Sequence, residues 1–165
     1  MELRLAGITP ESVVDGPGVR FTIFAQGCKH QCSKCHNPAT HSFTAGKLFK
    51  VEEIIEQIKE KSLITGVTFT GGDPFFQATR FAQLGQKIKN LDQELDIITY
   101  TGFLYEELIQ DQEKLSLVKL TDVLIDGLFD EDKEDLSLNY RGSYNQRVID
   151  VKESLRTDKV VEVKL

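Results

Sequence analysis

The three cysteines of this chain lie within eight residues of one another, and this clustering restricts the fold more than any other feature of the sequence. Cys28, Cys32 and Cys35 have the spacing Cys-x3-Cys-x2-Cys, which is short enough for one loop to bring three thiolates to a single inorganic centre. Iron–sulfur clusters are normally held by four cysteine thiolates. Three ligands on a cluster of four irons leave one iron with an open position, as a catalytic metal centre requires.

A structural zinc site is the alternative interpretation of the same spacing. Such a site has four protein ligands, and His30, His36 or His41 could supply the fourth. A disulfide framework fits less well, because three cysteines leave one thiol unpaired. Thiolates bound to metal are typical of a reducing compartment, so we expect a cytoplasmic protein.

Composition and charge narrow the class of protein. The chain has 165 residues, of which 40% are hydrophobic and 28% charged, and this indicates one globular domain over residues 1–165. A net charge of −6 argues against a general nucleic-acid or anionic-membrane surface. No apolar run approaches the roughly 20 residues of a membrane span, and no secretory leader is recognisable. We therefore expect neither a nucleic-acid nor a membrane partner.

Segments with strand and helix patterns alternate along the chain. Apolar β-rich runs predict strands, and apolar residues spaced three and four apart predict helices. The strands are expected at 3–6 (a short edge strand), 20–26, 66–70, 95–100, 121–126, 148–151 and 159–163. The helices are expected at 51–61, about 77–90 and 104–110, and the segments 14–20, 37–50 and 130–135 are expected to be turns and solvated loops.

This alternation is typical of βα units around a parallel sheet. A complete eight-fold barrel needs about 250 residues, more than this chain has. We predict an α/β fold in which five or six strands form an open, incomplete (β/α) barrel.

Four of the predicted strands are followed by residues of unusual type. The cysteine loop follows the first of the four, Gly71-Gly72-Asp73-Pro74 the second, Thr101-Gly102 the third and Asp126-Gly127 the fourth. Ligand sites in parallel α/β folds lie at the carboxyl ends of the strands, so these segments should meet at one rim. Glycine and aspartate at such turns also serve as helix caps, and this alternative stays open, above all for Asp126.

Taken together, these motifs resemble those of the radical S-adenosylmethionine enzymes. The cysteine loop after one strand and Gly-Gly-Asp-Pro after the next carry the first part of the resemblance. Within that superfamily the chain looks like the activating proteins of the anaerobic ribonucleotide reductase. That closer similarity lies in Asp-Gly-Pro-Gly-Val-Arg at 15–20, Thr-Gly-Gly-Asp-Pro at 70–74, Asp-Val-Leu-Ile-Asp-Gly at 122–127 and Arg-Gly-Ser-Tyr-Asn-Gln at 141–146.

The resemblance implies two cofactors and a set of residues that bind them. Cys28, Cys32 and Cys35 would hold a 4Fe–4S cluster, with S-adenosylmethionine bound at the open iron. Gly71 and Gly72 lack a Cβ and would let the backbone approach the methionine part. The other expected cofactor-binding residues are Asp73 as a turn cap, Lys34, Cys35 and His36 beside the adenine, and Thr101 and Asp126 at strand ends.

Some positions depart from the superfamily pattern or stay open. Many of its members have an aromatic residue just before the third cysteine, where this chain has Lys34. His36 could replace it by stacking, or could form a hydrogen bond within the loop. His30 and His41 are expected to be solvated. The segment from Arg141 to Arg147 is a candidate for gripping a partner or fixing the cofactor carboxylate, with a hydrogen-bonded structural loop as the alternative.

The implied activity is that of an enzyme, a glycyl-radical activase. A reduced cluster would cleave S-adenosylmethionine, and the 5′-deoxyadenosyl radical would take a hydrogen atom from a glycine of the reductase large subunit. The partners would be that subunit and a low-potential electron donor such as a flavodoxin. No catalytic side chain is expected beyond the cluster and cofactor sites. The alternatives are a radical enzyme acting on another glycyl-radical enzyme or a small molecule, and a non-catalytic iron–sulfur or zinc module.

Overall fold

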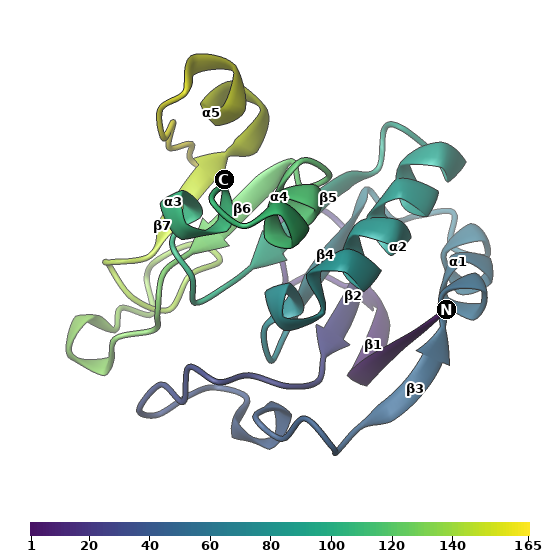
Figure 1. The fold of residues 1–165 in the computed structure, drawn as a ribbon, viewed down its shortest axis with the longest axis horizontal. Helices are drawn as coiled ribbons and strands as arrows, with labels where there is room; N and C mark the ends of the chain where they lie inside the picture. Colours follow the sequence, from purple (N-terminus) through teal and green to yellow (C-terminus); the bar gives the residue numbers. More distant parts are fainter.

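Seven strands form one mixed sheet in the computed structural model, which describes residues 1–165 (Figure 1). Their order across the sheet is β3-β1-β2-β4-β5-β6-β7. The strands are β1 (Glu2–Ser12), β2 (Arg20–Ala25), β3 (Lys47–Lys50), β4 (Gly66–Gly71), β5 (Asp96–Tyr100), β6 (Val123–Asp126) and β7 (Arg147–Asp150). β2, β4, β5 and β6 run parallel, and β1, β3 and β7 pair antiparallel with their neighbours. The prediction of an α/β fold with an open sheet is confirmed.

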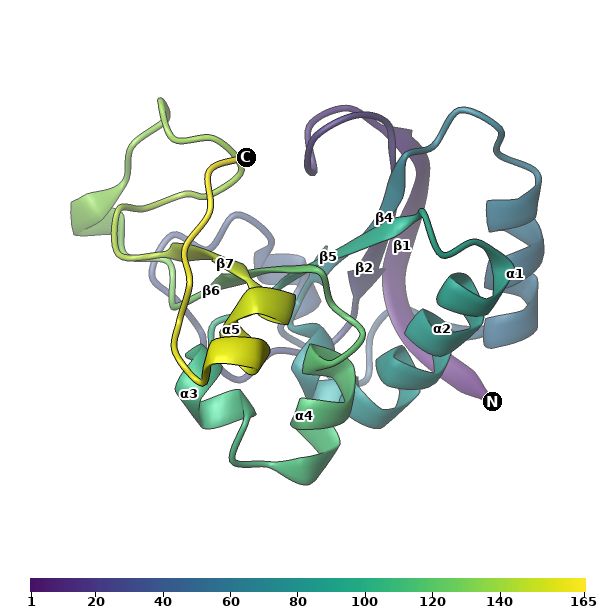
Figure 2. The ribbon, with the colours of Figure 1, turned by 90° about the horizontal axis from the view of Figure 1, so that it is seen from above.

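All the α-helices pack on the same face of this sheet (Figure 2). They are α1 (Val51–Lys59), α2 (Ala78–Leu91), α3 (Tyr105–Leu108), α4 (Gln112–Val118) and α5 (Val151–Thr157). Each contributes at least one side chain to a single core of 26 buried residues, which also takes side chains from six of the strands. Burial of one such aliphatic or aromatic side chain contributes about 1.5–3 kcal/mol. The helix-covered face therefore holds the sheet together.

The opposite face of the sheet carries no α-helix. It carries a small cluster of Ile98, Ile125 and Val148, against which Tyr140 and the C-terminal Leu165 pack. In Figure 2 the segment after β1, the segment between β6 and β7 and the C-terminal tail surround this face. The fold thus leaves one side of the parallel strands open to a ligand.

The N-terminal part differs from the prediction. β1 has eleven residues rather than four and is not an edge strand, because β3, in the segment expected to be a turn, pairs with its outer side. Gly7 and Pro10 interrupt the apolar pattern of β1, and its register with β2 shifts twice. Pairing with a neighbour on both sides holds this strand in place.

The C-terminal part also differs. Helices α4 and α5 were not predicted, and the expected strand at 159–163 is only a single bridge between Glu162 and Ile149. α5 begins at Val151, one residue after β7, because Asp150 caps it by accepting a hydrogen bond from the Glu153 N–H. Both helices are short, with seven residues each, which gives little room for a periodic pattern.

Candidate functional site

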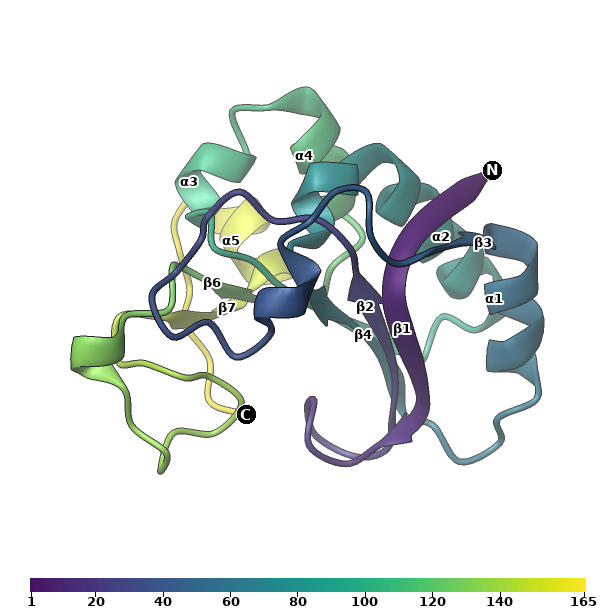
Figure 3. The same cartoon turned by 90° about the horizontal axis from the view of Figure 1, so that it is seen from below.

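A cavity of about 420 Å³ lies at the carboxyl ends of the parallel strands. All three cysteines line it, together with residues that follow β4, β5 and β6, namely Gly72, Thr101, Gly102 and Gly127. The loops around 14–15 and 129–146 close its sides. Figure 3 shows the long segment between β2 and β3, which contains the cysteines, passing these strand ends. The four strand ends therefore meet at one rim, as the topology predicts.

The cysteine loop is held by its backbone. Gly27 N–H donates to the Thr40 carbonyl at 2.8 Å, and Cys28 N–H donates to the His41 carbonyl at 3.2 Å. Gln31 and Lys34, each just before a cysteine, have φ of +51° and +50°. This left-handed conformation is uncommon for residues with a side chain. Lys34 lies in a turn that the Cys35 N–H closes by donating to the Cys32 carbonyl at 3.2 Å.

The thiols lie in a partly buried setting. Burial is the main reason why the pKa values of Cys28 and Cys32 are raised above the ordinary thiol value. The Asn37 N–H donates to the Cys35 sulfur at 3.4 Å. No three Cys, His, Asp or Glu side chains stand close enough together to bind one metal ion. The three cysteines instead lie at separate positions along the wall of one cavity.

Asp73 joins three loops beneath this cavity. Its side chain is only 1% exposed. Oδ1 accepts from the Phe75 N–H at 2.9 Å, so Asp73 caps its turn as predicted. Oδ2 accepts from His30 Nε2 at 2.8 Å, from Thr101 Oγ1 at 2.8 Å and from the Gly102 N–H at 3.0 Å. The carboxylate therefore fixes the cysteine loop and the end of β5 to the turn after β4.

The expectation of two solvated histidines was wrong. The His30 side chain is 14% exposed and its ring contacts those of Phe76 and Phe103, with centroids 5.4 and 4.6 Å away. His41 has a buried Nε2 with no hydrogen-bond partner. The sequence did not indicate that His30 is buried and hydrogen-bonded to Asp73, because Asp73 lies 43 residues further along the chain.

Gly71 and Gly72 are required by packing within the chain. Gly71 has φ of +97°, and a Cβ there would lie 2.7 Å from the Ala25 nitrogen. A Cβ on Gly72 would lie 2.5 Å from the Gly27 oxygen. Backbone atoms cannot move aside as a flexible side chain can. The two glycines therefore let the turn after β4 pack directly against β2 and the start of the cysteine loop.

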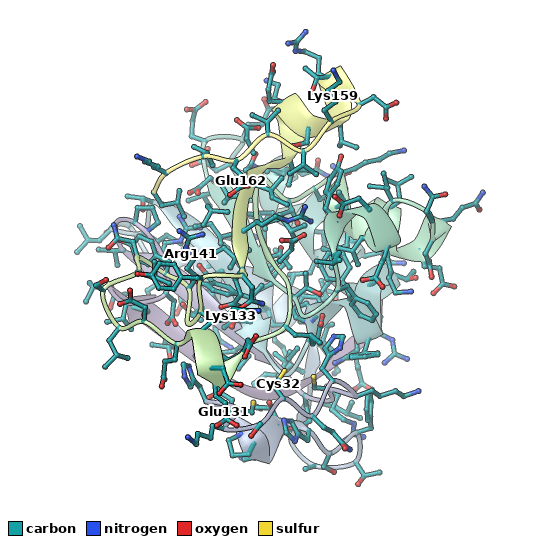
Figure 4. The ribbon with its side chains drawn as sticks, turned by 90° about the vertical axis from the view of Figure 1, so that its left-hand side faces the viewer. Cys32, Glu131, Lys133, Arg141, Lys159 and Glu162 are labelled. Carbon is teal, nitrogen blue, oxygen red and sulfur yellow. The ribbon has the colours of Figure 1, made fainter.

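Lys34 and His36 contact the segment between β6 and β7. Lys34 is exposed and is absent from the cavity wall, and its Nζ lies 2.9 Å from Glu131. Glu131 also accepts from Ser33 Oγ at 2.9 Å, so this acidic segment is more than a solvated face. His36 lines the cavity and its ring lies 4.7 Å from that of Phe129. Figure 4 shows Glu131 beside Cys32 on the neighbouring loop.

Asp126, which was predicted to be a cofactor-binding residue, is not among the residues that line the cavity. It is fully buried, and its oxygens accept from Arg147 Nε at 2.9 Å, from Arg147 Nη2 and from the Tyr105 N–H at 2.8 Å. The helix-cap alternative therefore describes this residue better, because Tyr105 begins α3. Arg147 is also bound by Glu106, which leaves its guanidinium occupied within the chain.

Unlike Arg147, Arg141 lines the cavity, and it is the only lysine or arginine that does so. Its Nη1 donates to the Gln146 carbonyl at 2.7 Å. Several other lining residues were not predicted as site residues, among them Asp15, Tyr100 and Tyr140. Tyr100 is the last residue of β5, and burial raises its pKa. Its place at a strand end is the one sequence signal that marks it.

The chain resembles known proteins over most of its length. Residues 14–149 match the model of a family described as a 4Fe-4S single cluster domain. An anaerobic ribonucleoside-triphosphate reductase-activating protein of Vibrio cholerae serotype O1 is 38% identical over 143 residues, which are 83% of this chain and 91% of that protein. The proteins of the same name from Enterobacteria phage T4 and Escherichia coli K12 are 37% and 34% identical over 145 residues, covering 86% and 84% of this chain and 90% and 93% of theirs.

One solved structure, QueE from Escherichia coli, has a TM-score of 0.48 at 16% identity and covers 62% of this chain and 53% of its own. None of the helices found here has the length and apolar character to cross a membrane. The identity to the activating proteins extends over more than four fifths of the chain. This chain belongs to the family of anaerobic ribonucleoside-triphosphate reductase-activating proteins.

Proposed function

We propose that this protein is a radical S-adenosylmethionine enzyme that generates a glycyl radical on an anaerobic ribonucleoside-triphosphate reductase. One observation carries the proposal. The three cysteines of the loop that follows β2 line the same cavity as residues at or just after the ends of β4, β5 and β6, in a chain related to reductase-activating proteins. When bound, a 4Fe–4S cluster and S-adenosylmethionine would supply one-electron cleavage to methionine and a 5′-deoxyadenosyl radical, which takes a hydrogen atom from a glycine of the reductase.

The residues present fit the cluster. Cys28, Cys32 and Cys35 would hold it, because thiolates are the usual ligands of iron–sulfur clusters and all three cysteines line one cavity. The thiols must lose their protons to bind metal, and burial of Cys28 and Cys32 favours the protonated form, so assembly releases protons. The Asn37 N–H donates to the Cys35 sulfur and would orient this ligand.

The remaining cavity wall fits S-adenosylmethionine. A volume of about 420 Å³ lies within the usual range for small-molecule sites, roughly 300–1,000 Å³. Arg141, the one arginine of the wall, offers a charged donor for the methionine carboxylate, while His36 and Phe129 offer rings for the adenine. Gly72 and Thr101 present small groups at the strand ends. Lys34, Asp73 and Asp126 do not line the cavity. They would act indirectly, by holding neighbouring loops in place through Glu131, Thr101 and Arg147 respectively.

The fold fits a protein substrate. We infer an incomplete (β/α) barrel of the radical S-adenosylmethionine type, formed as one domain over residues 1–165. The helices cover only one face of the sheet, so a glycine-bearing loop of the reductase large subunit can approach the cavity from the other face. A low-potential carrier such as a flavodoxin would supply the electron. No general acid or base is required of the chain.

Reconstitution with iron and sulfide under anoxic conditions tests the proposal. We expect the wild-type protein to bind about four irons and to give a glycyl-radical EPR doublet when mixed with the reductase large subunit, S-adenosylmethionine and a reductant. Cys28→Ser, Cys32→Ser and Cys35→Ser should each lose the doublet. Ser33→Ala, in the same loop, should retain it. A doublet of wild-type size from any of the cysteine variants contradicts the proposed ligand set.

A further inference from the structure

A second cavity, of about 380 Å³, lies behind the cysteine loop. Arg4, Phe43, Phe76 and Arg80 are among the residues that line it. It shares no lining residue with the cavity that contains the cysteines. Neither the proposed cofactor site nor the approach of the reductase glycine uses it.

A wall of aromatic rings separates the two cavities. Phe43 and Phe76 line the second cavity, and their ring centroids are 5.6 Å apart. Phe76 is 5.4 Å from the ring of His30, which lines the cofactor cavity. Phe43 also packs against the residue before Cys28, because a Cβ on Gly27 would lie 2.6 Å from its ring. Only one layer of side chains therefore lies between the second cavity and the cysteine loop.

Positive charge gathers around this cavity although the chain as a whole carries −6. Arg4 and Arg80 line it, and Lys29 Nζ lies 5.9 Å from the Phe43 ring centroid. None of these three cations forms an ion pair within the chain. Lys114 also lines the cavity but is paired with Asp111, and Glu113 is the only carboxylate in the lining. The surface is thus a basic patch on an acidic protein.

We propose that this basic patch, formed by Arg4, Lys29 and Arg80 around the second cavity, is the docking surface for an acidic one-electron carrier protein. The inference rests on the proposed cluster. One electron passes from the reduced carrier across the Phe43, Phe76 and His30 layer to the cluster, so the carrier is oxidised and the cluster reduced with no atom transferred. Complementary charge speeds such an encounter.

Docking here separates the two protein partners. The reductase glycine has to reach the cofactor cavity on the helix-free face, whereas the carrier would bind on the other side of the cysteine loop. Both proteins can then be bound in the same cycle. A carrier that used the cofactor cavity would have to leave before the reductase could enter.

Charge reversal tests the proposal, with reduced flavodoxin as the probe carrier. Lys29→Glu and Arg80→Glu change exposed side chains, and Lys152→Glu on α5 is a control with the same charge change at an exposed, unpaired lysine. Stopped-flow absorbance follows reduction of the reconstituted cluster. We expect the Lys29→Glu/Arg80→Glu double variant to react about tenfold more slowly than the control at low salt, with the difference shrinking at high salt. Photoreduced deazaflavin, a small reductant that needs no docking surface, should reduce all variants equally.

The outcomes are distinguishable. Equal flavodoxin rates for the double variant and the Lys152→Glu control overturn the docking proposal. So does a double variant that loses the glycyl-radical doublet under photoreduced deazaflavin, because the patch would then bind the reductase. A wild-type protein that deazaflavin cannot reduce refutes the proposed cluster itself, and the docking proposal fails with it.

Discussion

Replacement of Asp73 by asparagine tests the hydrogen-bonded centre of the site with almost no change of volume. The carboxylate accepts four hydrogen bonds, one at Oδ1 from the Phe75 N–H and three at Oδ2, from His30, Thr101 and Gly102. Asparagine has one acceptor oxygen and an NH₂ group that can only donate. Whichever way the amide is turned, at least one N–H donor of the protein faces another donor.

The cost follows from the two orientations. The better one keeps the amide oxygen near the Oδ2 position and leaves the buried Phe75 N–H unpaired, which costs about 1–3 kcal/mol. The three retained bonds lose a charged acceptor and weaken, each by up to about 1 kcal/mol. We therefore expect Asp73→Asn to lower the free energy of unfolding by about 3–5 kcal/mol and the melting temperature by about 10 °C.

Urea unfolding of the metal-free, reduced protein measures this difference. Asp92→Asn is the matched control, because Asp92 is exposed and accepts one local hydrogen bond, from the Glu94 N–H. The control should change the free energy of unfolding by less than about 0.5 kcal/mol. If Asp73→Asn cost less than about 1 kcal/mol, the four contacts would not be holding these loops together.

Three further perturbations have defined outcomes. Gly71→Ala forces a Cβ to within 2.7 Å of the Ala25 nitrogen at φ of +97°, and should cost about 2–4 kcal/mol in urea unfolding. Arg147→Ala leaves the fully buried Asp126 carboxylate without its guanidinium, and should cost about 3–5 kcal/mol by the same assay. The hydrogen bond from Arg147 lowers the pKa of Glu106 in the folded protein. Glu106→Gln should therefore lower the free energy of unfolding by at most about 1 kcal/mol at pH 7. This difference should disappear as the pH falls through the lowered pKa of the folded state.

Controls for these variants come from the same chain. Gly7→Ala should be neutral or stabilising, since a Cβ there meets nothing within 4 Å. Arg156→Ala removes an exposed arginine paired with Glu153, and no measurable change is expected. An Arg147→Ala variant as stable as Arg156→Ala would show that the buried Asp126 carboxylate does not need a cationic partner. A Glu106→Gln difference that grows on acidification would contradict the sign of the pKa shift.

The parallel part of the fold could be predicted because its signals are local. β2, β4, β5 and β6 are apolar runs bounded by glycine, proline or aspartate, and α1 has its apolar residues on one face. A topological rule then places the strand ends together. Only residues 3–6 of β1 were predicted and β3 was missed, because β1 is held by pairing with β3 and β2, and β3 by pairing with β1.

The site residues also differ in whether their sequence signal is local. The cysteines and glycines were predicted as site residues from their type and spacing, and the structure places them on the wall of one cavity. The partners of Asp73 and Asp126 could not, since His30 and Arg147 are 43 and 21 residues away from them in sequence. A buried aspartate at the end of a strand is compatible both with a ligand and with an internal pair. Only the three-dimensional structure assigns Asp126 to Arg147 and leaves Arg141 on the cavity wall.

The most direct test of the central claim is an EPR spectrum of the anoxically reconstituted and reduced protein, recorded with and without S-adenosylmethionine. A cluster held by Cys28, Cys32 and Cys35 has one iron without a protein ligand. Binding of the cofactor at that iron should shift the g-values of the reduced cluster. An identical spectrum with and without S-adenosylmethionine, or no reducible cluster at all, would contradict the radical mechanism.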